Sequence, residues 1–381
     1  MRLKLKISTL IFLMCFLFQN SYSQQNVNGW YWMNGQPQSL QLSWIKILNS
    51  TTFYAVGNNG NFMKSIDGGD TWLINSQAGP IDNSSTSGGG TRNLATAWFF
   101  NANTGVVGGA SISTNGDAIG RTTDGGATFT KISLGAAAHS VLGFYFLNSA
   151  TGYACGNSNT KLYKTTDGGI SWNPVDNVPA SLTFNSVFAF DENKIFLTSS
   201  SRKVVRTTDA GSTWITDVLP GTLNTTITDI GFKNASTGYV TGNGNYFGLT
   251  TDGGVSWVQQ ISPGAAGQRD LKIVGNDAYT VGDNTLMYKT TDDGLTWSSI
   301  NFVDGSNSNQ PSPFTMYGMD INGSDFAVVG ANGVINISND GGSTWRNKNY
   351  CSPGSGMNLS AVWADKPSGN IWTGGTAGNI A

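Results

Sequence analysis

The chain has very few of the residues on which most enzymes and metal-binding proteins depend. Only 12% of its 381 residues are charged, and it contains three cysteines, one histidine (His139) and one glutamate (Glu192). No Cys/His cluster has zinc spacing, and no glycine-rich phosphate loop leads into a helix. We therefore expect no cofactor, no metal site and no nucleophilic triad.

Long apolar runs are also scarce, and the one that exists stands at the N-terminus. Three basic residues precede the run Leu10–Phe18, and the small-residue site Ser21-Tyr22-Ser23 follows it. This order is typical of a secretory signal peptide, and the run is short for a membrane span. We predict a signal peptide over residues 1–23, a mature chain 24–381 that starts at Gln24, export to the cell surface or medium, and no membrane span after cleavage.

The mature chain would have no basic tract and no disulfide framework. It keeps 18 basic and 23 acidic residues, a net charge of −5, which argues against nucleic acid or anionic lipid as a partner. Its two cysteines are Cys155, in an apolar segment, and Cys351. We expect Cys155 to act as a small buried hydrophobe and not to form a bridge.

Glycine and aromatic residues are what the sequence has in abundance. It contains 50 Gly, 12 Trp, 12 Tyr and 19 Phe. Glycine without a collagen period favours a fold with many tight turns, and the aromatic residues supply the burial that folding requires.

One motif recurs seven times, with Asp at its start and an aromatic residue five positions later. The seven Asp and aromatic pairs are Asp67 and Trp72, Asp124 and Phe129, Asp167 and Trp172, Asp209 and Trp214, Asp252 and Trp257, Asp292 and Trp297, and Asp340 and Trp345. The Asp-to-Asp spacings are 57, 43, 42, 43, 40 and 48 residues. Such a period indicates either propeller blades or a helical array.

The residues within each unit favour strands. The third unit has apolar segments at Val141–Leu147, Tyr153–Gly156 and Lys161–Thr166, separated by Gly, Asn and Ser, and a fourth begins at Ser171. No segment has a sustained period of 3.6. The sequence predicts an all-β propeller of four-stranded antiparallel blades, seven of them complete. Trp30-Tyr31-Trp32 and Leu359–Ala381 leave open a composite eighth blade or a truncated C-terminus.

The motif has a structural explanation. An Asp side chain can accept backbone N–H bonds and close a turn. The glycine two residues after the Asp occurs in all seven copies, as a residue with positive φ would. The residue four positions after the Asp is always Ser or Thr. The aromatic residue that follows it begins the outer strand and can bury against the sheet. We therefore assign all fourteen of these Asp and aromatic residues a structural role.

Thr151-Gly-Tyr-Ala-Cys-Gly156 followed by Lys164-Thr-Thr-Asp-Gly-Gly-Ile-Ser-Trp172 resembles the Asp-box, or bacterial neuraminidase, repeat. Over roughly residues 37–381 the chain is similar to the photosystem II stability/assembly factor-like propellers, in a secreted bacterial form. This resemblance implies a polypeptide-binding assembly factor with an arginine-rich patch. The mature chain has six arginines, and Arg121 and Arg206 occupy one repeat position.

Two hydrolytic activities are the alternatives to binding. A sialidase needs an arginine triad, but Arg121 and Arg206 occupy a repeat position and the other four arginines of the mature chain fall at unrelated places. A glycosidase needs only two carboxylates, and Asp229 and Asp270 take equivalent places on predicted innermost strands, with Asp320 near the same place in the next unit. We predict that the chain is not an enzyme but a monomeric module that binds protein or glycan. Its long loops Gly79–Asn93 and Asp304–Pro313 are candidate recognition sites; the alternative is a glycoside hydrolase.

Overall fold

The computed structural model describes residues 26–27, 30–31, 41–75, 93–110, 117–135, 140–157, 161–222, 224–260, 267–283, 286–302, 315–347, 359–365 and 370–375. The predicted signal peptide, His139, Cys351 and both long loops, apart from Asn93, lie outside these residues. The prediction of a domain boundary at residue 23 therefore stays a prediction.

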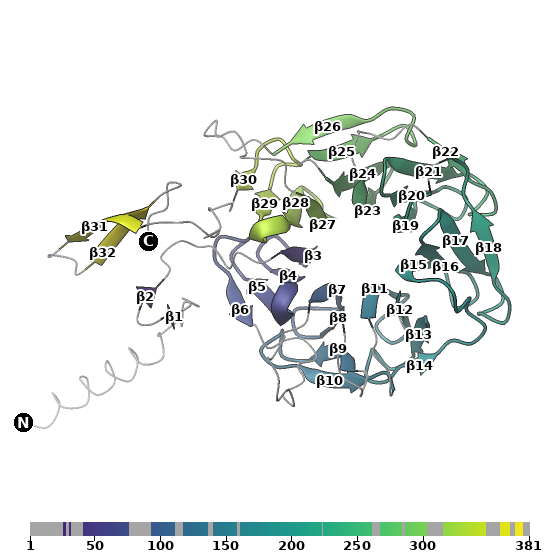
Figure 1. Cartoon of the computed structure of the whole chain (residues 1–381), viewed down its shortest axis with the longest axis horizontal. Helices are drawn as coiled ribbons and strands as arrows, with labels where there is room; N and C mark the ends of the chain where they lie inside the picture. The colour runs from purple at the N-terminus through teal and green to yellow at the C-terminus, as the bar shows by residue number, and fades with distance from the viewer. Residues whose placement is uncertain are drawn as a thin grey trace, which may run out of the picture.

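Seven four-stranded antiparallel sheets stand around a common axis as the blades of a ring (Figure 1). Each blade uses four consecutive strands, which confirms the predicted all-β propeller with seven complete blades. The helical segments among the described residues are two short 3-10 turns, η1 (Asn58–Gly60) and η2 (Ala331–Gly333).

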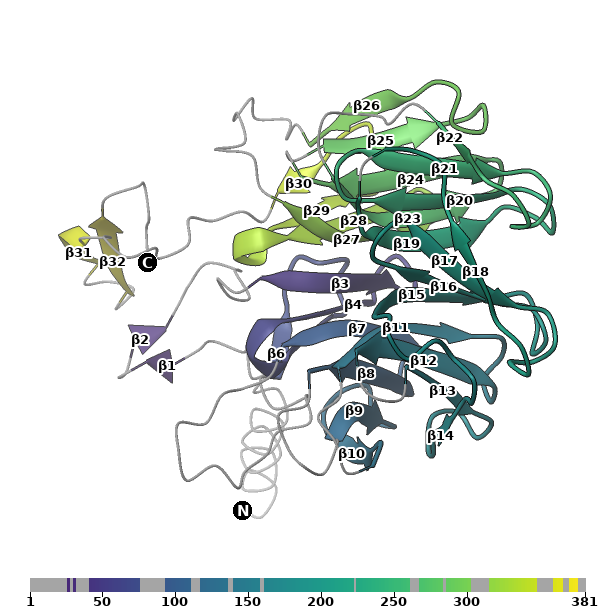
Figure 2. The ribbon, with the colours of Figure 1, turned by 45° about the vertical axis from the view of Figure 1, so that its right-hand side comes forward.

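The strands occupy the same four radial positions in every blade. The first strands, nearest the axis, are β3 (Leu42–Ile47), β7 (Leu94–Phe99), β11 (Ser140–Phe146), β15 (Phe184–Ala189), β19 (Ile227–Phe232), β23 (Gln268–Val274) and β27 (Met316–Asn322). The second strands are β4 (Phe53–Gly57), β8 (Gly105–Gly109), β12 (Gly152–Asn157), β16 (Ile195–Ser199), β20 (Gly238–Gly242), β24 (Asp277–Gly282) and β28 (Asp325–Gly330). The third strands are β5 (Asn61–Ser65), β9 (Asp117–Thr122), β13 (Leu162–Thr165), β17 (Lys203–Thr207), β21 (Tyr246–Thr250), β25 (Leu286–Thr290) and β29 (Ile335–Ser338). The outer strands, which form the rim (Figure 2), are β6 (Leu73–Asn75), β10 (Thr130–Ser133), β14 (Asn173–Pro174), β18 (Ile215–Val218), β22 (Val258–Gln259), β26 (Ser298–Asn301) and β30 (Arg346–Asn347).

Burial follows the radial position. The second strand of a blade, such as β4 or β16, is buried at every residue, because neighbouring blades cover both of its faces. It therefore reads as a continuous run of apolar or small residues. The outer strand β18 is exposed at three of its four residues, and its sequence Ile-Thr-Asp-Val mixes apolar and polar residues.

The core consists of seven clusters of buried side chains, and each cluster is built by two neighbouring blades. The motif aromatic contributes to the cluster between its own blade and the preceding one. Trp172, 8% exposed, packs with Val106 and Ile119 of the second blade. The aromatic residue therefore joins blades, which goes beyond its expected burial against its own sheet.

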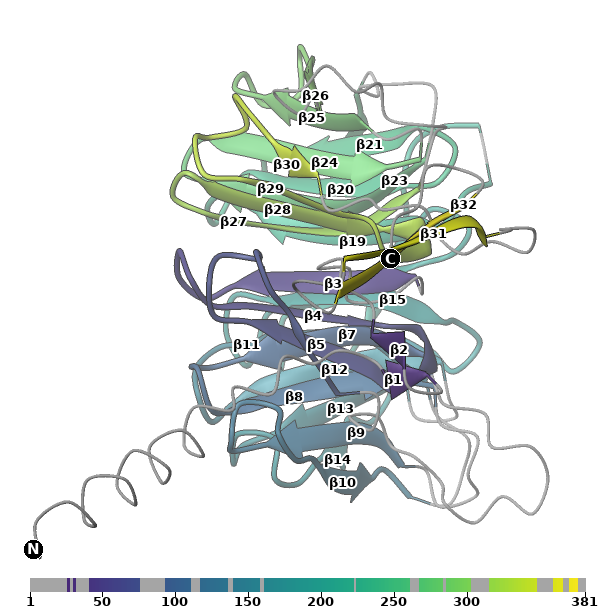
Figure 3. The ribbon, with the colours of Figure 1, turned by 90° about the vertical axis from the view of Figure 1, so that its left-hand side faces the viewer.

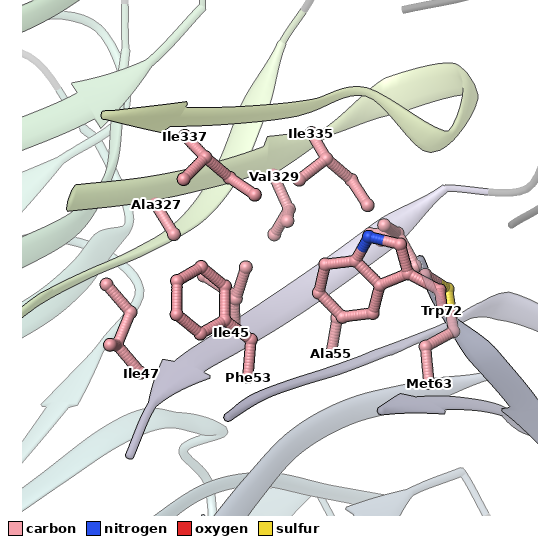
Figure 4. Close-up of a cluster of buried hydrophobic side chains, with 11 residues drawn as sticks. Ile45, Ile47, Phe53, Ala55, Met63, Trp72, Ala327, Val329, Ile335 and Ile337 are labelled. Atoms are coloured by element: carbon pink, nitrogen blue, oxygen red, sulfur yellow. The ribbon is translucent and has the colours of Figure 1, made fainter. Parts of the chain in front are cut away.

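The ring closes between the seventh and first blades (Figure 3). Ile45, Phe53 and Trp72 of the first blade pack against Ile335 and Ile337 of the seventh, as Figure 4 shows. The terminal strands β1 (Asn26–Val27) and β2 (Trp30–Tyr31) form a separate two-stranded sheet, and so do β31 (Leu359–Asp365) and β32 (Asn370–Gly375). They lie outside the ring in Figure 1, so the described residues form no composite eighth blade.

Candidate functional site

The repeated motif forms the turn between the third and outer strands, which we call the box turn. In the third blade, Asp167 Oδ1 accepts the amides of Ile170 (3.0 Å) and Ser171 (2.9 Å), and Oδ2 accepts the Ser171 hydroxyl (2.5 Å). Slight burial acts against ionisation, yet the bonds from Ser171 and Thr165 lower the pKa of Asp167 to about 2. The carboxylate is therefore ionised, and hydrogen-bond donors of its own turn occupy both of its oxygens.

A hydroxyl that the sequence reasoning missed completes this turn. Thr165 Oγ1 donates to Asp167 Oδ1 (2.8 Å) and accepts the Gly169 amide (2.9 Å). The residue two before the Asp is Ser or Thr in all seven copies: Ser65, Thr122, Thr165, Thr207, Thr250, Thr290 and Ser338. That recurrence was the signal that could have identified it.

The second glycine of the box turn is required for two reasons. Gly169 has φ 80°, as predicted for this position, and a Cβ there would lie 2.8 Å from Val106 Cγ1 of the preceding blade. The position before it also has positive φ, but Ala210 and Asp293 occupy it at 59°. Space does not separate the two positions, because a Cβ at Gly168 would also lie 2.8 Å from the Ser149 carbonyl oxygen. The first position has φ of 59–73°, in the left-handed region that Ala210 and Asp293 adopt, whereas the second has φ of 80–90° and is always glycine.

The residues nearest the axis are found by aligning the seven first strands through their β-bulges. The position two residues after the last pair before the bulge is occupied by Trp44, Thr96, Gly143, Ser186, Asp229, Asp270 and Gly318. Asp229 and Asp270 are therefore equivalent, as predicted. Gly318 takes the equivalent position in the seventh blade. Asp320, which was expected near this position, lies two residues further along the strand.

The carboxylates of Asp229 and Asp270 meet at one backbone amide. The Leu271 amide donates to Asp229 Oδ2 (3.1 Å) and to Asp270 Oδ1 (2.9 Å). Asp229 Oδ1 also accepts the Ser186 hydroxyl (2.6 Å) and the Ile230 amide (2.9 Å). Asp229 thus connects the fourth, fifth and sixth blades.

Two further carboxylates continue these connections around the axis. Asp270 Oδ2 accepts the Met319 amide of the seventh blade (2.7 Å), and Asp320 Oδ2 accepts the Ile47 amide of the first blade (2.8 Å). Lys46 also lies 3.2 Å from Asp320 Oδ2. The inner edge of a first strand leaves alternate amides without a strand partner, and these carboxylates satisfy them.

The charges in this cluster alter one another's ionisation. Burial, followed by the charge of Asp270, raises the pKa of Asp229 to about 7, while Lys272 and the Ser186 hydroxyl oppose the shift. Burial alone would lower the pKa of Lys272, but Asp270, Asp229 and Asp320 raise it above its usual value. Lys272 lies 3.4 Å from Asp270 Oδ1 and partly neutralises the acidic residues.

This geometry favours a structural role over catalysis. Glycoside hydrolysis needs one carboxyl group to deliver a proton and another to attack or to activate water. Both oxygens of Asp229 and of Asp270 instead accept bonds from the protein itself. Among the described residues, no group of three or more His, Cys, Asp or Glu could hold a metal ion. Cys155 is a free, buried thiol, and burial raises its pKa.

The arginines in the described part of the chain are engaged by partners within the protein. Arg121 donates to the Gly168 carbonyl (3.0 Å), Arg202 to the Leu219 carbonyl (3.1 Å) and Arg206 to Asp217 (2.7 Å). Arg269 pairs with Asp283 (3.2 Å) and Arg346 with Asp70 (2.6 Å). Each of the five bonds to a different partner within the protein.

These observations define a seven-bladed β-propeller whose repeated turns and axial carboxylates hold the ring together. Residues 216–360, less than half of the chain, match the family model described as photosynthesis system II assembly factor YCF48. The match confirms the predicted resemblance to that family. No curated protein sequence matches the chain.

Solved structures agree on the fold. A structure titled "YCF48 bound to D1 peptide" has 16% identity and a TM-score of 0.58, covering 80% of this chain and 94% of that one. YCF48 from Cyanidioschyzon merolae has 17% identity and a TM-score of 0.56, covering 79% and 96%. The WD40 propeller domain of Doa1 has 12% identity and a TM-score of 0.58, covering 79% and 93%. At these identities the likeness establishes the architecture and not the partner.

Proposed function

We propose that this protein is a non-catalytic propeller that binds polypeptide. The observation that carries the proposal is the occupation of Asp229 and Asp270 by bonds to the Ser186 hydroxyl and to the amides of Leu271 and Met319. The fold therefore uses the chain's best catalytic candidates to join blades. A rigid ring with such a core offers faces for recognition.

Protein is favoured over glycan as the partner. The family model that matches residues 216–360 describes an assembly factor, and one similar propeller is titled as bound to a peptide. The five arginines that the structure describes are each engaged by a partner within the protein, which favours a binding surface other than an arginine-rich patch.

We also propose that the protein is exported and acts as a monomer. The basic residues, the apolar run and the small-residue site at the N-terminus support export. N-terminal sequencing of the protein recovered outside the cytoplasm would give Gln24 as the first residue. Among the described residues, no helix is both long and apolar enough to cross a membrane.

Binding is tested with the purified mature chain on parallel arrays of peptides and glycans. The proposal expects saturable binding to a set of peptides and none to glycans. Glycan binding without peptide binding would overturn it. A propeller of the same fold from an unrelated family, such as a WD40 domain, controls for nonspecific adsorption.

A further inference from the structure

The hairpin of β31 and β32 reproduces the inner half of a blade. Its register shifts between Leu359 and Ala361, as the register of every first strand in the ring shifts at its bulge. Leu359 pairs with Gly375 before the shift, as Leu42 pairs with Gly57 in the first blade. The two strands therefore take the places of a first and a second strand.

The outer edge of β32 has no strand beside it among the described residues. In each of the seven blades, a third strand pairs with the second strand along this edge. A two-stranded sheet is marginally stable in water, and a row of unpaired amides and carbonyls is a template for another strand. The complete blades therefore show what kind of strand fits the edge of β32.

The third blade shows which backbone groups face this edge. The Lys161 carbonyl accepts the amide of Gly156 in β12 (3.2 Å). Because backbone groups alternate sides along a strand, Tyr163 also faces β12, where it stands opposite Ala154. Thr373 takes the position of Ala154 in β32, since each is in the second pair after the register shift. The backbone amide and carbonyl of Thr373 therefore point to the open edge.

The neighbouring position of the second strand indicates the chemistry of the strand that pairs with it. One residue before Thr373 and its equivalents, five blades have an aromatic residue, and in four of these a Lys or Arg stands opposite on the third strand. The four pairs are Tyr54 with Lys64, Tyr153 with Lys164, Phe196 with Arg206, and Tyr279 with Lys289.

The contact between the members of such a pair is a cation–π interaction. The Lys64 ammonium lies 5.5 Å from the centre of the Tyr54 ring, and the Lys289 ammonium lies 5.4 Å from the centre of the Tyr279 ring. In β32 this position is occupied by Trp372. Tryptophan is the aromatic residue that attracts a cation most strongly, so the register favours a Lys or Arg opposite Trp372.

The third strands of these four blades share a pattern of two apolar residues, then Lys or Arg, then Ser or Thr. The four segments are Phe62–Ser65, Leu162–Thr165, Val204–Thr207 and Met287–Thr290. The 381 residues contain this pattern nowhere else. Each of the four segments is already paired within its own blade. A strand of this pattern at the edge of β32 therefore has to come from another polypeptide.

We propose that β32 binds, by strand addition, an extended segment of a partner polypeptide in which two apolar residues precede Lys or Arg and then Ser or Thr. The segment runs antiparallel to β32 in the place of a third strand. Its second apolar residue bonds to the backbone of Thr373, and its Lys or Arg stands opposite Trp372. The inference rests on the proposed function and adds to it the element, the register and the sequence of the partner.

The experiment titrates a fluorescent peptide with the sequence Lys161–Trp172 into the purified mature protein, read by anisotropy. We expect saturable binding, and a peptide with Lys164→Glu should bind about threefold or more weakly, because the cation opposite Trp372 is lost. N-methylation of the Tyr163 amide, which faces β32 in the proposed register, should weaken binding about tenfold. N-methylation of the Lys164 amide, which faces the other side, is the matched control and should have little effect.

The protein variants locate the site on β32. Thr373→Pro removes an edge-facing N–H and should weaken binding about tenfold, since proline is tolerated at an open edge but cannot donate. Thr216→Pro is the matched control: the Leu219 amide bonds to the Arg202 carbonyl, so Thr216 faces the open edge of β18, and binding should not change. Trp372→Leu should make the Lys164 and Glu peptides bind alike. The melting temperature establishes that each variant is folded.

Hydrogen exchange of the Thr373 amide distinguishes the possible occupants of the edge. We expect fast exchange in the protein alone and protection when the peptide is added. Protection without the peptide would overturn the inference. The edge would then be covered by the chain itself if protection is independent of protein concentration, and by a second copy if protection rises with concentration.

Three results of the titrations would also overturn the inference. If folded Thr373→Pro binds the peptide as wild type does, the edge is the wrong site, while polypeptide binding itself stands. If the Glu peptide binds as tightly as the Lys164 peptide, the stated partner chemistry is wrong. If this peptide does not bind while the arrays show other peptides bound, the inference fails and the proposed function stands; arrays without any bound peptide would remove both.

Discussion

At the scale of single residues, the box turn is held by two side chains. Thr165 Oγ1 accepts the Gly169 amide, and Asp167 accepts the Ser171 amide and hydroxyl. We expect Asp167→Ala and Thr165→Val each to cost about 1–2 kcal/mol of unfolding free energy, because donors in the turn lose their acceptor. Chemical denaturation measures both.

The control for this prediction is Ser212→Ala. Ser212 is an exposed residue within the fourth blade's turn that donates only to the Asp209 carbonyl (2.9 Å). It should change the free energy of unfolding by less than about 0.5 kcal/mol. An Asp167→Ala variant that is as stable as wild type but loses a binding partner would contradict the structural role of the turn.

A second prediction at this scale concerns the pH dependence of stability. Burial raises the pKa of Asp229 to about 7, above its value in the unfolded chain. The folded state then binds the proton more tightly, so this group favours folding at acid pH, and its contribution is lost as pH rises from about 4 to about 7. Asp229→Asn should remove that part of the pH dependence.

The measurement is the melting temperature between pH 4 and pH 8 for wild type and Asp229→Asn. The matched control is Asp217→Asn, which removes a carboxylate from a partly exposed ion pair with Arg206. We expect the difference between wild type and Asp229→Asn to depend on pH across this range. A constant difference would show that Asp229 stays ionised throughout.

At the scale of the structural element, the box aromatic is a contact between blades. Trp172 is 8% exposed and lies in the cluster that joins the second and third blades. Trp214, its equivalent in the fourth blade, is only half-buried. Trp172→Ala should therefore cost about 3–5 kcal/mol, and Trp214→Ala clearly less.

Thermal and denaturant unfolding of the two variants checks this order. The comparison is matched, because both residues stand five positions after a box Asp in the same kind of turn. Equal losses for the two would show that the aromatic residue stabilises its own turn and not the junction between blades.

The elements also show what sequence reasoning could predict and what it could not. The box spacing and the four apolar segments of the third unit predicted seven four-stranded blades, because a turn motif and a strand period are both local. The equivalence of Trp98, Tyr145 and Phe188 was missed, because these first-strand residues fall in one column only when the β-bulges are aligned. A bulge shifts the register by a residue and has no clear sequence signature here.

The positions of the axial carboxylates could be predicted from the sequence, but their hydrogen bonds to neighbouring blades could not. Asp229 and Asp270 could be placed on equivalent strands from the repeat alone. Their bonds to Ser186, Leu271 and Met319 could not, because they depend on how neighbouring blades stand side by side around the axis. Lys272 was missed for the same reason.

At the scale of the whole molecule, the ring is closed by side chains and not by a shared sheet. The first and seventh blades meet through the cluster around Phe53 and Ile337, the bond from the Ile47 amide to Asp320 and the pair of Arg346 with Asp70. A molecule whose axial carboxylates are used for closure is one that we expect to bind without turnover.

The direct test of that claim is hydrolysis of a panel of β-glucans, xyloglucan and sialosides by the purified mature protein, alongside Asp229→Asn and Asp270→Asn. The account predicts no turnover of any substrate by wild type, and a lowered melting temperature at neutral pH for Asp270→Asn, since the Met319 amide loses its charged acceptor. Turnover by wild type that is abolished in both folded variants would contradict it and establish a glycosidase.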